Sequence, residues 1–135
     1  GPRHGSARDA LLSHARAFVL PSLLEGFPLA PLEAMASGLP VMLSDIPPHR
    51  ELLDEDLDGA AGWVVPDDGW PDALRRVAAM EPDMLSVMGD VGRAHVETER
   101  SWDAVADATV AVYRRVLGMG PSGNGSGLVS KEGRP

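Results

Sequence analysis

The sequence predicts an α/β fold with about three parallel strands flanked by helices. Three short apolar runs, at residues 17–20, 41–43 and 61–65, are typical of strands buried on both faces. Segments with helical spacing of apolar residues separate these runs, and glycine and proline punctuate the boundaries. This alternation favours a parallel sheet with right-handed crossovers. Because three strands make only a small sheet, we expect one open edge and interpret the chain as part of a domain.

The helices are predicted from apolar periodicity and from their end signals. Ser6 is the expected N-cap of the first helix. Gly38 and then Pro40 stop the second helix, and Ser101 is the expected N-cap of the last one. The predicted helices cover residues 7–15, 31–37, 48–54, 71–80, 82–97 and 101–117.

The chain divides into a folded segment and a tail. Its 135 residues are enough for one hydrophobic core, which we place in residues 1–117. Residues 118–135 are rich in glycine and serine and have no apolar periodicity, so we expect a flexible tail there.

Composition excludes several classes of function. The net charge is −8 and the basic residues are scattered, which argues against a nucleic-acid partner. No apolar run reaches the roughly 20 residues that a membrane-spanning helix needs. The chain has no cysteine, which excludes disulfides, thiolate metal sites and cysteine nucleophiles. The absence of cysteine also fits a cytoplasmic protein.

The most informative stretch, PSLLEGFPLAPLEAMASGLPV at residues 21–41, joins the first predicted strand to the second. A strand end, a glycine-containing turn and a helix N-terminus form an anion site, because the first amides of a helix have no internal partner. Pro28 and Pro31 carry no amide hydrogen. The remaining donors are the amides of Gly26, Phe27, Leu29, Ala30 and Leu32.

Two carboxylates, Glu25 and Glu33, bracket this helix tip. A carboxylate is a poor partner for a diphosphate but a good acceptor for the paired hydroxyls of a sugar. The pair therefore suits a diphosphate with a sugar at each end. On residue chemistry alone an alternative stays open, in which Glu33 complements the helix dipole and Glu25 is a loop charge.

Other chemistry-bearing residues are assigned structural roles. The D-x-D patterns at 54–56 and 56–58 lie in an acidic run that we interpret as a solvated face. The four histidines fall in separate segments and form no metal set, so no metal is expected. His49 and Arg50 follow a strand end, where we favour a surface or capping role over ligand contact. Trp63, Trp102 and Tyr113 have the spacing of packing residues.

The stretch at 21–41 resembles the signature of the retaining glycosyltransferases of family 4, whose fold is the two-domain GT-B type. Their motif is a glutamate, seven residues and a second glutamate within a PS…EGF…EAMA.G.PV framework. The similarity continues through SDIPPHREL at 44–52 and GWVVP at 62–66, and it ends in the closing helix at 101–117. It covers roughly residues 6–117.

The resemblance implies the C-terminal part of a Rossmann-like domain that binds a nucleoside diphosphate sugar. Glu33 would hold the ribose hydroxyls, and Glu25 would be the catalytic residue beside the donor sugar. The substrate-binding set implied is Gly26, Phe27, Pro28, Leu29, Ala30 and Glu33. The resemblance implies hexosyl transfer with retention to an unknown acceptor, and no metal, cofactor or covalent nucleophile.

Members of that family also have an N-terminal acceptor-binding domain and an Arg/Lys pair that neutralises the diphosphate, which the resemblance does not cover. We therefore expect an acceptor domain in cis or in trans, an inactive isolated chain, and self-association through the open sheet edge. Two alternatives stay open. One is a non-catalytic, split or degenerate half that docks onto a partner chain, and the other is a nucleotide-binding module of the same fold, such as a phosphorylase or epimerase.

Overall fold

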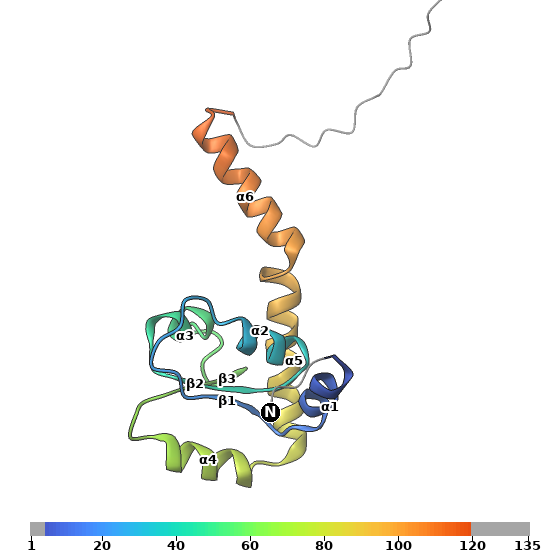
Figure 1. The fold of residues 1–135 in the computed structure, drawn as a ribbon, viewed down its shortest axis with the longest axis vertical. Coiled ribbons are helices and arrows are strands. Elements are labelled where there is room, and N and C mark those ends of the chain that lie inside the picture. Colours follow the sequence, from blue (N-terminus) through green and yellow to red (C-terminus); the bar gives the residue numbers. More distant parts are fainter. Residues whose placement is uncertain (1–4, 120–135) are drawn as a thin grey trace, which may run out of the picture. The chain divides into compact units, whose positions relative to one another are not determined.

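The computed structural model describes residues 5–119, so the expected tail at 118–135 lies outside the described residues except for its first two positions. The sheet has three parallel strands in the order β1–β2–β3 (Figure 1), which confirms the predicted class. In the register Phe18 lies opposite Val41, and Val41 lies opposite Gly62. The strands are β1 (Phe18–Leu20), β2 (Val41–Ser44) and β3 (Gly62–Val65).

The predicted helices are present, with two corrections at their N-termini. Ser6 is the first residue of α1 and not its N-cap, since Gly5 occupies that position with a φ of 57° that glycine adopts easily. The second helix begins at Leu29, two residues earlier than predicted. The helices are α1 (Ser6–His14), α2 (Leu29–Ala36), α3 (Pro47–Leu52), α4 (Trp70–Ala79), α5 (Pro82–Glu99) and α6 (Trp102–Val116).

Residues 5–101 form one compact unit with a core on each face of the sheet. Side chains alternate along β2, so Val41 and Leu43 pack on one face and Met42 packs on the other. The first core joins the sheet to α2 and α3, and α4 covers the opposite face (Figure 1). All four residues of β2 are buried, as expected for the central strand of a covered parallel sheet.

A second compact unit begins at Trp102 and contains α6. Among its described residues none is buried, and the side chains of Trp102 and Tyr113 are 88% and 65% exposed. These two side chains thus make no packing contact within α6 itself, and their predicted packing role stays a prediction. Trp63, in contrast, is half-buried against the core beneath α4.

Within the described residues, no helix has both the length and the apolarity needed to cross a bilayer.

Candidate functional site

The loop from Pro21 to Pro28 connects the carboxyl end of β1 to the N-terminus of α2. Ligands of α/β sheets gather at this edge. Pro28 has φ −80° and ψ 67°, the geometry of an inverse γ-turn, and the Leu29 amide donates to the Phe27 carbonyl at 2.9 Å. This turn directs the chain into α2, which explains why the helix begins before its predicted start.

The helix tip offers fewer free amides than its sequence suggests. Leu29 uses its amide in the turn, and the Leu32 amide donates to the Pro28 carbonyl at 3.4 Å. Among the described residues, the amides of Gly26, Phe27 and Ala30 make no hydrogen bond. Gly26 and Phe27 precede the N-terminus of α2 and Ala30 lies in its first turn, where the helix dipole favours an anion.

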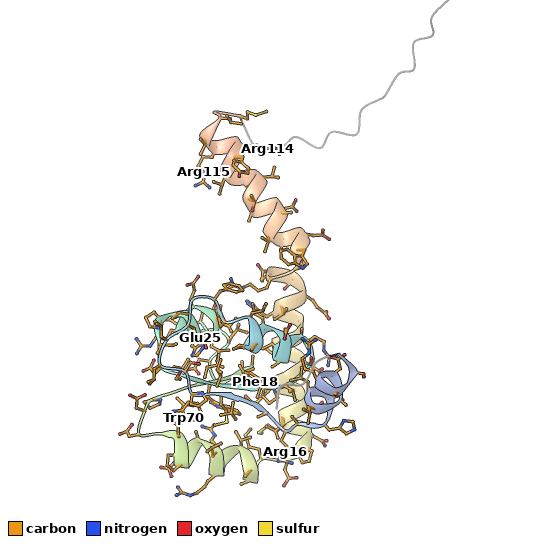
Figure 2. The ribbon with its side chains drawn as sticks, viewed as in Figure 1. Arg16, Phe18, Glu25, Trp70, Arg114 and Arg115 are labelled. Carbon is orange, nitrogen blue, oxygen red and sulfur yellow. The ribbon has the colours of Figure 1, made fainter. Side chains whose placement is uncertain are left out.

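Glu25 projects from the middle of this loop and is half-buried. Figure 2 shows it on the side of the sheet that α3 occupies, opposite α4. Its Oε1 atom accepts a hydrogen bond of 2.6 Å from the Ser22 hydroxyl. The carboxylate is thus oriented by a residue of its own loop.

Glu33 lies one turn inside α2 with 43% of its side chain exposed. Both of its carboxylate oxygens accept from Nη1 of Arg8 in α1, each at 3.1 Å. Sequence reasoning did not identify Arg8, because its place on the polar side of a short helix gives no signal of contact with a residue 25 positions away. The candidate ribose acceptor is therefore ion-paired in this structure.

A small hollow of about 90 Å³ lies beside the loop. Typical ligand pockets have volumes of roughly 300–1,000 Å³, so this hollow accommodates only part of a sugar nucleotide. Glu51 of α3 and Arg100 after α5 also line it. Glu51 lies in the SDIPPHREL stretch but was given no role there, and Arg100 lies outside the quoted motifs. The lining residues are Gly26, Phe27, Pro28, Leu32, Pro48, Glu51, Leu52 and Arg100.

Of the two residues after β2 that were given a surface or capping role, Arg50 is at the surface and His49 is not. His49 is fully buried, which corrects the surface role predicted for it. Its Nδ1 atom lies 2.9 Å from the Ser44 carbonyl oxygen. Arg50 is exposed and binds Asp45 with two nitrogens, and this hydrogen bonding holds the pKa of the Asp45 carboxyl below its ordinary value.

The acidic run has a structural use. Asp54 accepts hydrogen bonds from the amides of Asp56 and Leu57 at 3.1 and 3.2 Å, and Asp58 accepts from the Val64 amide at 3.1 Å. These carboxylates stabilise the turn before β3. Across the described residues, no three His, Asp or Glu side chains are grouped so that they could hold a metal ion.

The three-stranded parallel sheet, the proline-containing turn before α2 and the two glutamates that flank this turn are the features of part of a GT-B domain. The structure is similar to sucrose-phosphate synthase from Thermosynechococcus elongatus, with a TM-score of 0.67 and 29% sequence identity over 79% of this chain and 27% of that chain. Residues 4–88 match the family described as glycosyl transferases group 1. The chain belongs to this family.

Two relatives among the curated proteins match 80% and 56% of this chain. The MMP alpha-(1->4)-mannosyltransferase of Mycolicibacterium hassiacum is 39% identical over 111 residues, which are 80% of this chain and 26% of that protein. The O-antigen chain mannosyltransferase RfbU of Salmonella typhimurium is 44% identical over 78 residues, 56% of this chain and 21% of that protein. The chain thus spans about a quarter of the length of these relatives.

Proposed function

We propose that this chain is the donor-binding part of a retaining, metal-independent glycosyltransferase that transfers a hexosyl group from a nucleoside diphosphate sugar to an acceptor. The observation that carries the proposal is the helix tip, where the free amides of Gly26, Phe27 and Ala30 lie between the two glutamates of the motif. Membership of the glycosyl transferases group 1 family and relatives named as mannosyltransferases support a hexosyl donor.

Each part of the tip matches one part of the donor. Glu33 has acceptor capacity for two ribose hydroxyls, provided that Arg8 shares or releases its carboxylate. The amides near Ala30 and the helix dipole face the diphosphate and stabilise the negative charge that it gains on leaving. Glu25 and the Gly26–Phe27 backbone then contact the transferred sugar.

The size of the hollow supports a shared active site. At about 90 Å³ it holds only a fraction of a sugar nucleotide, so further walls must come from an acceptor-binding domain in cis or in trans. We therefore propose that the isolated chain binds donor without transferring the sugar. A chain without cysteine suits a reaction in the reducing cytoplasm, where we place it.

The test is a titration of the chain with UDP, GDP, ADP and dTDP followed by amide NMR shifts. We expect one nucleotide to produce saturable shifts at residues 26–33. Glu33→Ala should weaken this binding about tenfold or more, since it removes a charged acceptor of two hydrogen bonds. Glu97→Ala, an exposed glutamate of α5, is the matched control and should bind as the original chain does. A folded chain that binds none of the four nucleotides would contradict the proposal.

The open edge of β1 favours a second candidate function, a non-catalytic half that docks onto another chain. Within the described residues β1 pairs only with β2, so its other edge carries unpaired backbone groups. The same titration separates the two candidates, because a docking module without donor chemistry shows no saturable shifts at the helix tip.

A further inference from the structure

A chain of hydrogen bonds runs from the buried His49 to Glu25 across three elements. His49 of α3 contacts Ser44 at the end of β2, at 2.9 Å to its carbonyl oxygen and 3.3 Å to its hydroxyl. The Ser44 hydroxyl bonds the carbonyl oxygen of Ser22, which follows β1. The Ser22 hydroxyl in turn bonds Oε1 of Glu25 at 2.6 Å. The carboxyl ends of two strands are thereby tied to the carboxylate at the candidate donor site.

The chemistry of each group sets the direction of every bond. A carbonyl oxygen only accepts, so Nδ1 of His49 must carry the proton that faces Ser44. The Ser44 hydroxyl donates to the Ser22 carbonyl, which leaves the Ser44 oxygen to accept from His49. The Ser22 hydroxyl donates to the Glu25 carboxylate. All donors therefore point from His49 toward Glu25, beginning with the Nδ1–H group of the imidazole.

The His49–Ser44 end of this series of hydrogen bonds is buried, whereas Ser22 and Glu25 are half-buried. His49 is 0% exposed and Ser44 only 3%. The other ring nitrogen of His49, Nε2, is buried without a hydrogen-bond partner in the described part of the chain. A buried polar nitrogen without a partner is unfavourable, so an apolar side chain would fill this space better if packing were its only use. Within the described residues, the Nδ1–H group is the part of the imidazole that forms hydrogen bonds.

We propose that His49 is a positioning residue for Glu25, acting through Ser44 and Ser22. It fixes the ends of β1 and β2 relative to each other, and so the loop on which Glu25 is oriented toward the donor sugar. This inference rests on the proposed function and extends it to a residue that lies 24 positions from Glu25 in the sequence. His49 acts on the sugar end of the donor, whereas the nucleotide end depends on Glu33 and the tip of α2.

The test compares three variants by calorimetric titration. His49→Leu removes the Nδ1–H donor, His49→Asn restores an N–H group at a similar distance from the backbone, and Ser22→Ala cuts the last link without altering the buried imidazole. Each variant is titrated with UDP and UDP-glucose and with GDP and GDP-mannose. The quantity compared is the gain in affinity that the sugar adds to its nucleoside diphosphate.

In His49→Leu and Ser22→Ala we expect this gain in affinity to fall roughly tenfold. That is the worth of one hydrogen bond between the Glu25 carboxylate and the sugar. The affinity for the nucleoside diphosphate should stay unchanged. His49→Asn should recover most of the gain. The ¹³C shift of the Glu25 carboxyl should move in the first two variants and return in the third, a response that packing alone would not produce. Equal loss of nucleoside diphosphate and sugar nucleotide binding, or an unmoved Glu25 carboxyl shift, overturns the proposal.

Two further outcomes separate this inference from the proposed function. If the original chain binds no nucleotide, the proposed function fails, and the Glu25 shift still decides whether His49 orients that carboxylate. If the chain binds nucleotides but the sugar adds no affinity in the original chain, the role of His49 at the sugar end is overturned. Should His49→Leu not fold, Ser22→Ala supplies the same comparison with the core intact.

Discussion

At the scale of single residues, Arg8 is the contact that bears most directly on the proposed ribose site. Its guanidinium occupies both oxygens of Glu33, although each side chain remains more than 40% exposed. An exposed ion pair of this kind contributes only about 0–1 kcal/mol. Arg8→Ala should therefore strengthen nucleoside diphosphate binding by about two- to fivefold, because ribose hydroxyls no longer compete with a cation.

Arg75→Ala, which removes an exposed ion pair with Asp72 in α4, is the control for this measurement and should leave the affinity unchanged. Weaker binding by Arg8→Ala would show instead that the guanidinium contacts the nucleotide directly.

The ion pair of Asp45 and Arg50 should make the stability of the chain depend on pH. Hydrogen bonding to Arg50 lowers the pKa of Asp45 from its ordinary value of 3.8. A lowered pKa in the folded state adds stability above the ordinary value, and this contribution is lost as pH falls through the folded value. Arg50→Gln should raise the Asp45 pKa. The variant should have a lower free energy of unfolding than the original chain near neutral pH, and this difference should shrink below about pH 4. Carboxyl-carbon NMR shifts followed against pH provide the check, and identical Asp45 titrations in both proteins would disprove it.

How much of the site could be predicted depended on whether its residues are neighbours in sequence. The spacing of Glu25 and Glu33 around a helix start was visible from residue types and from the family resemblance. The contacts of Arg8 and Arg100 were not, because tertiary proximity leaves no local pattern. The use of the Leu29 amide in a γ-turn depends on the ψ angle of Pro28, which residue identity does not determine.

At the scale of elements, the packing of α5 against the turn that follows α2 depends on one close approach. A Cβ atom at Gly89 would lie 1.9 Å from the Gly38 carbonyl oxygen, so backbone must shift to admit it. Gly89→Ala should therefore destabilise the chain by roughly 1–3 kcal/mol or more, as overpacking does. Gly92→Ala, one turn along the same helix, is the matched control.

At Gly92 an added Cβ meets Met35 and Ala61 at an ordinary 3.5 Å. Alanine also favours helix over glycine by up to about 1 kcal/mol, so Gly92→Ala should be neutral or stabilising. Chemical denaturation monitored by circular dichroism compares the two variants. Equal effects of both substitutions would refute the steric account of this helix pair.

Elements were predicted where periodicity alone identifies them, and less well where tertiary structure decides. The apolar runs of β1, β2 and β3 and the stripe of α5 correspond to the observed elements within a few residues. The helical spacing of α6 was also visible, but the spacing of Trp102 and Tyr113 does not reveal whether anything covers them. A periodic apolar face indicates a partner without identifying it.

At the scale of the whole molecule, the number of strands and their parallel direction follow from short buried runs joined by helices. The prediction of an open edge follows from that count, because a sheet of three strands cannot close on itself. The structure assigns the edges: β2 is central, and β1 and β3 are outermost within the described residues. The matched segments span about a quarter of the length of the family relatives.

The open edge of β1 presents backbone groups that can pair with another strand. Phe18 donates its amide to the Pro40 carbonyl on the β2 side, so pleating turns the amide of the next residue, Val19, toward the open edge. An exposed edge strand recruits another strand, and two copies of this chain supply one to each other. We expect the chain to self-associate at high concentration. Val19→Pro should weaken this association, because it removes an outward donor while the bonds to β2 remain.

Val19→Thr is the matched control, because it alters the side chain, keeps the amide and retains a β-branched residue. Sedimentation velocity across a range of concentrations measures the association of all three proteins. If the edge mediates contact, only Val19→Pro shifts the equilibrium toward monomer. A chain that stays monomeric at every concentration, or a Val19→Pro variant that associates like the original, would show that the β1 edge does not drive association. The missing walls of the donor site would then have to be supplied through other surfaces of the chain.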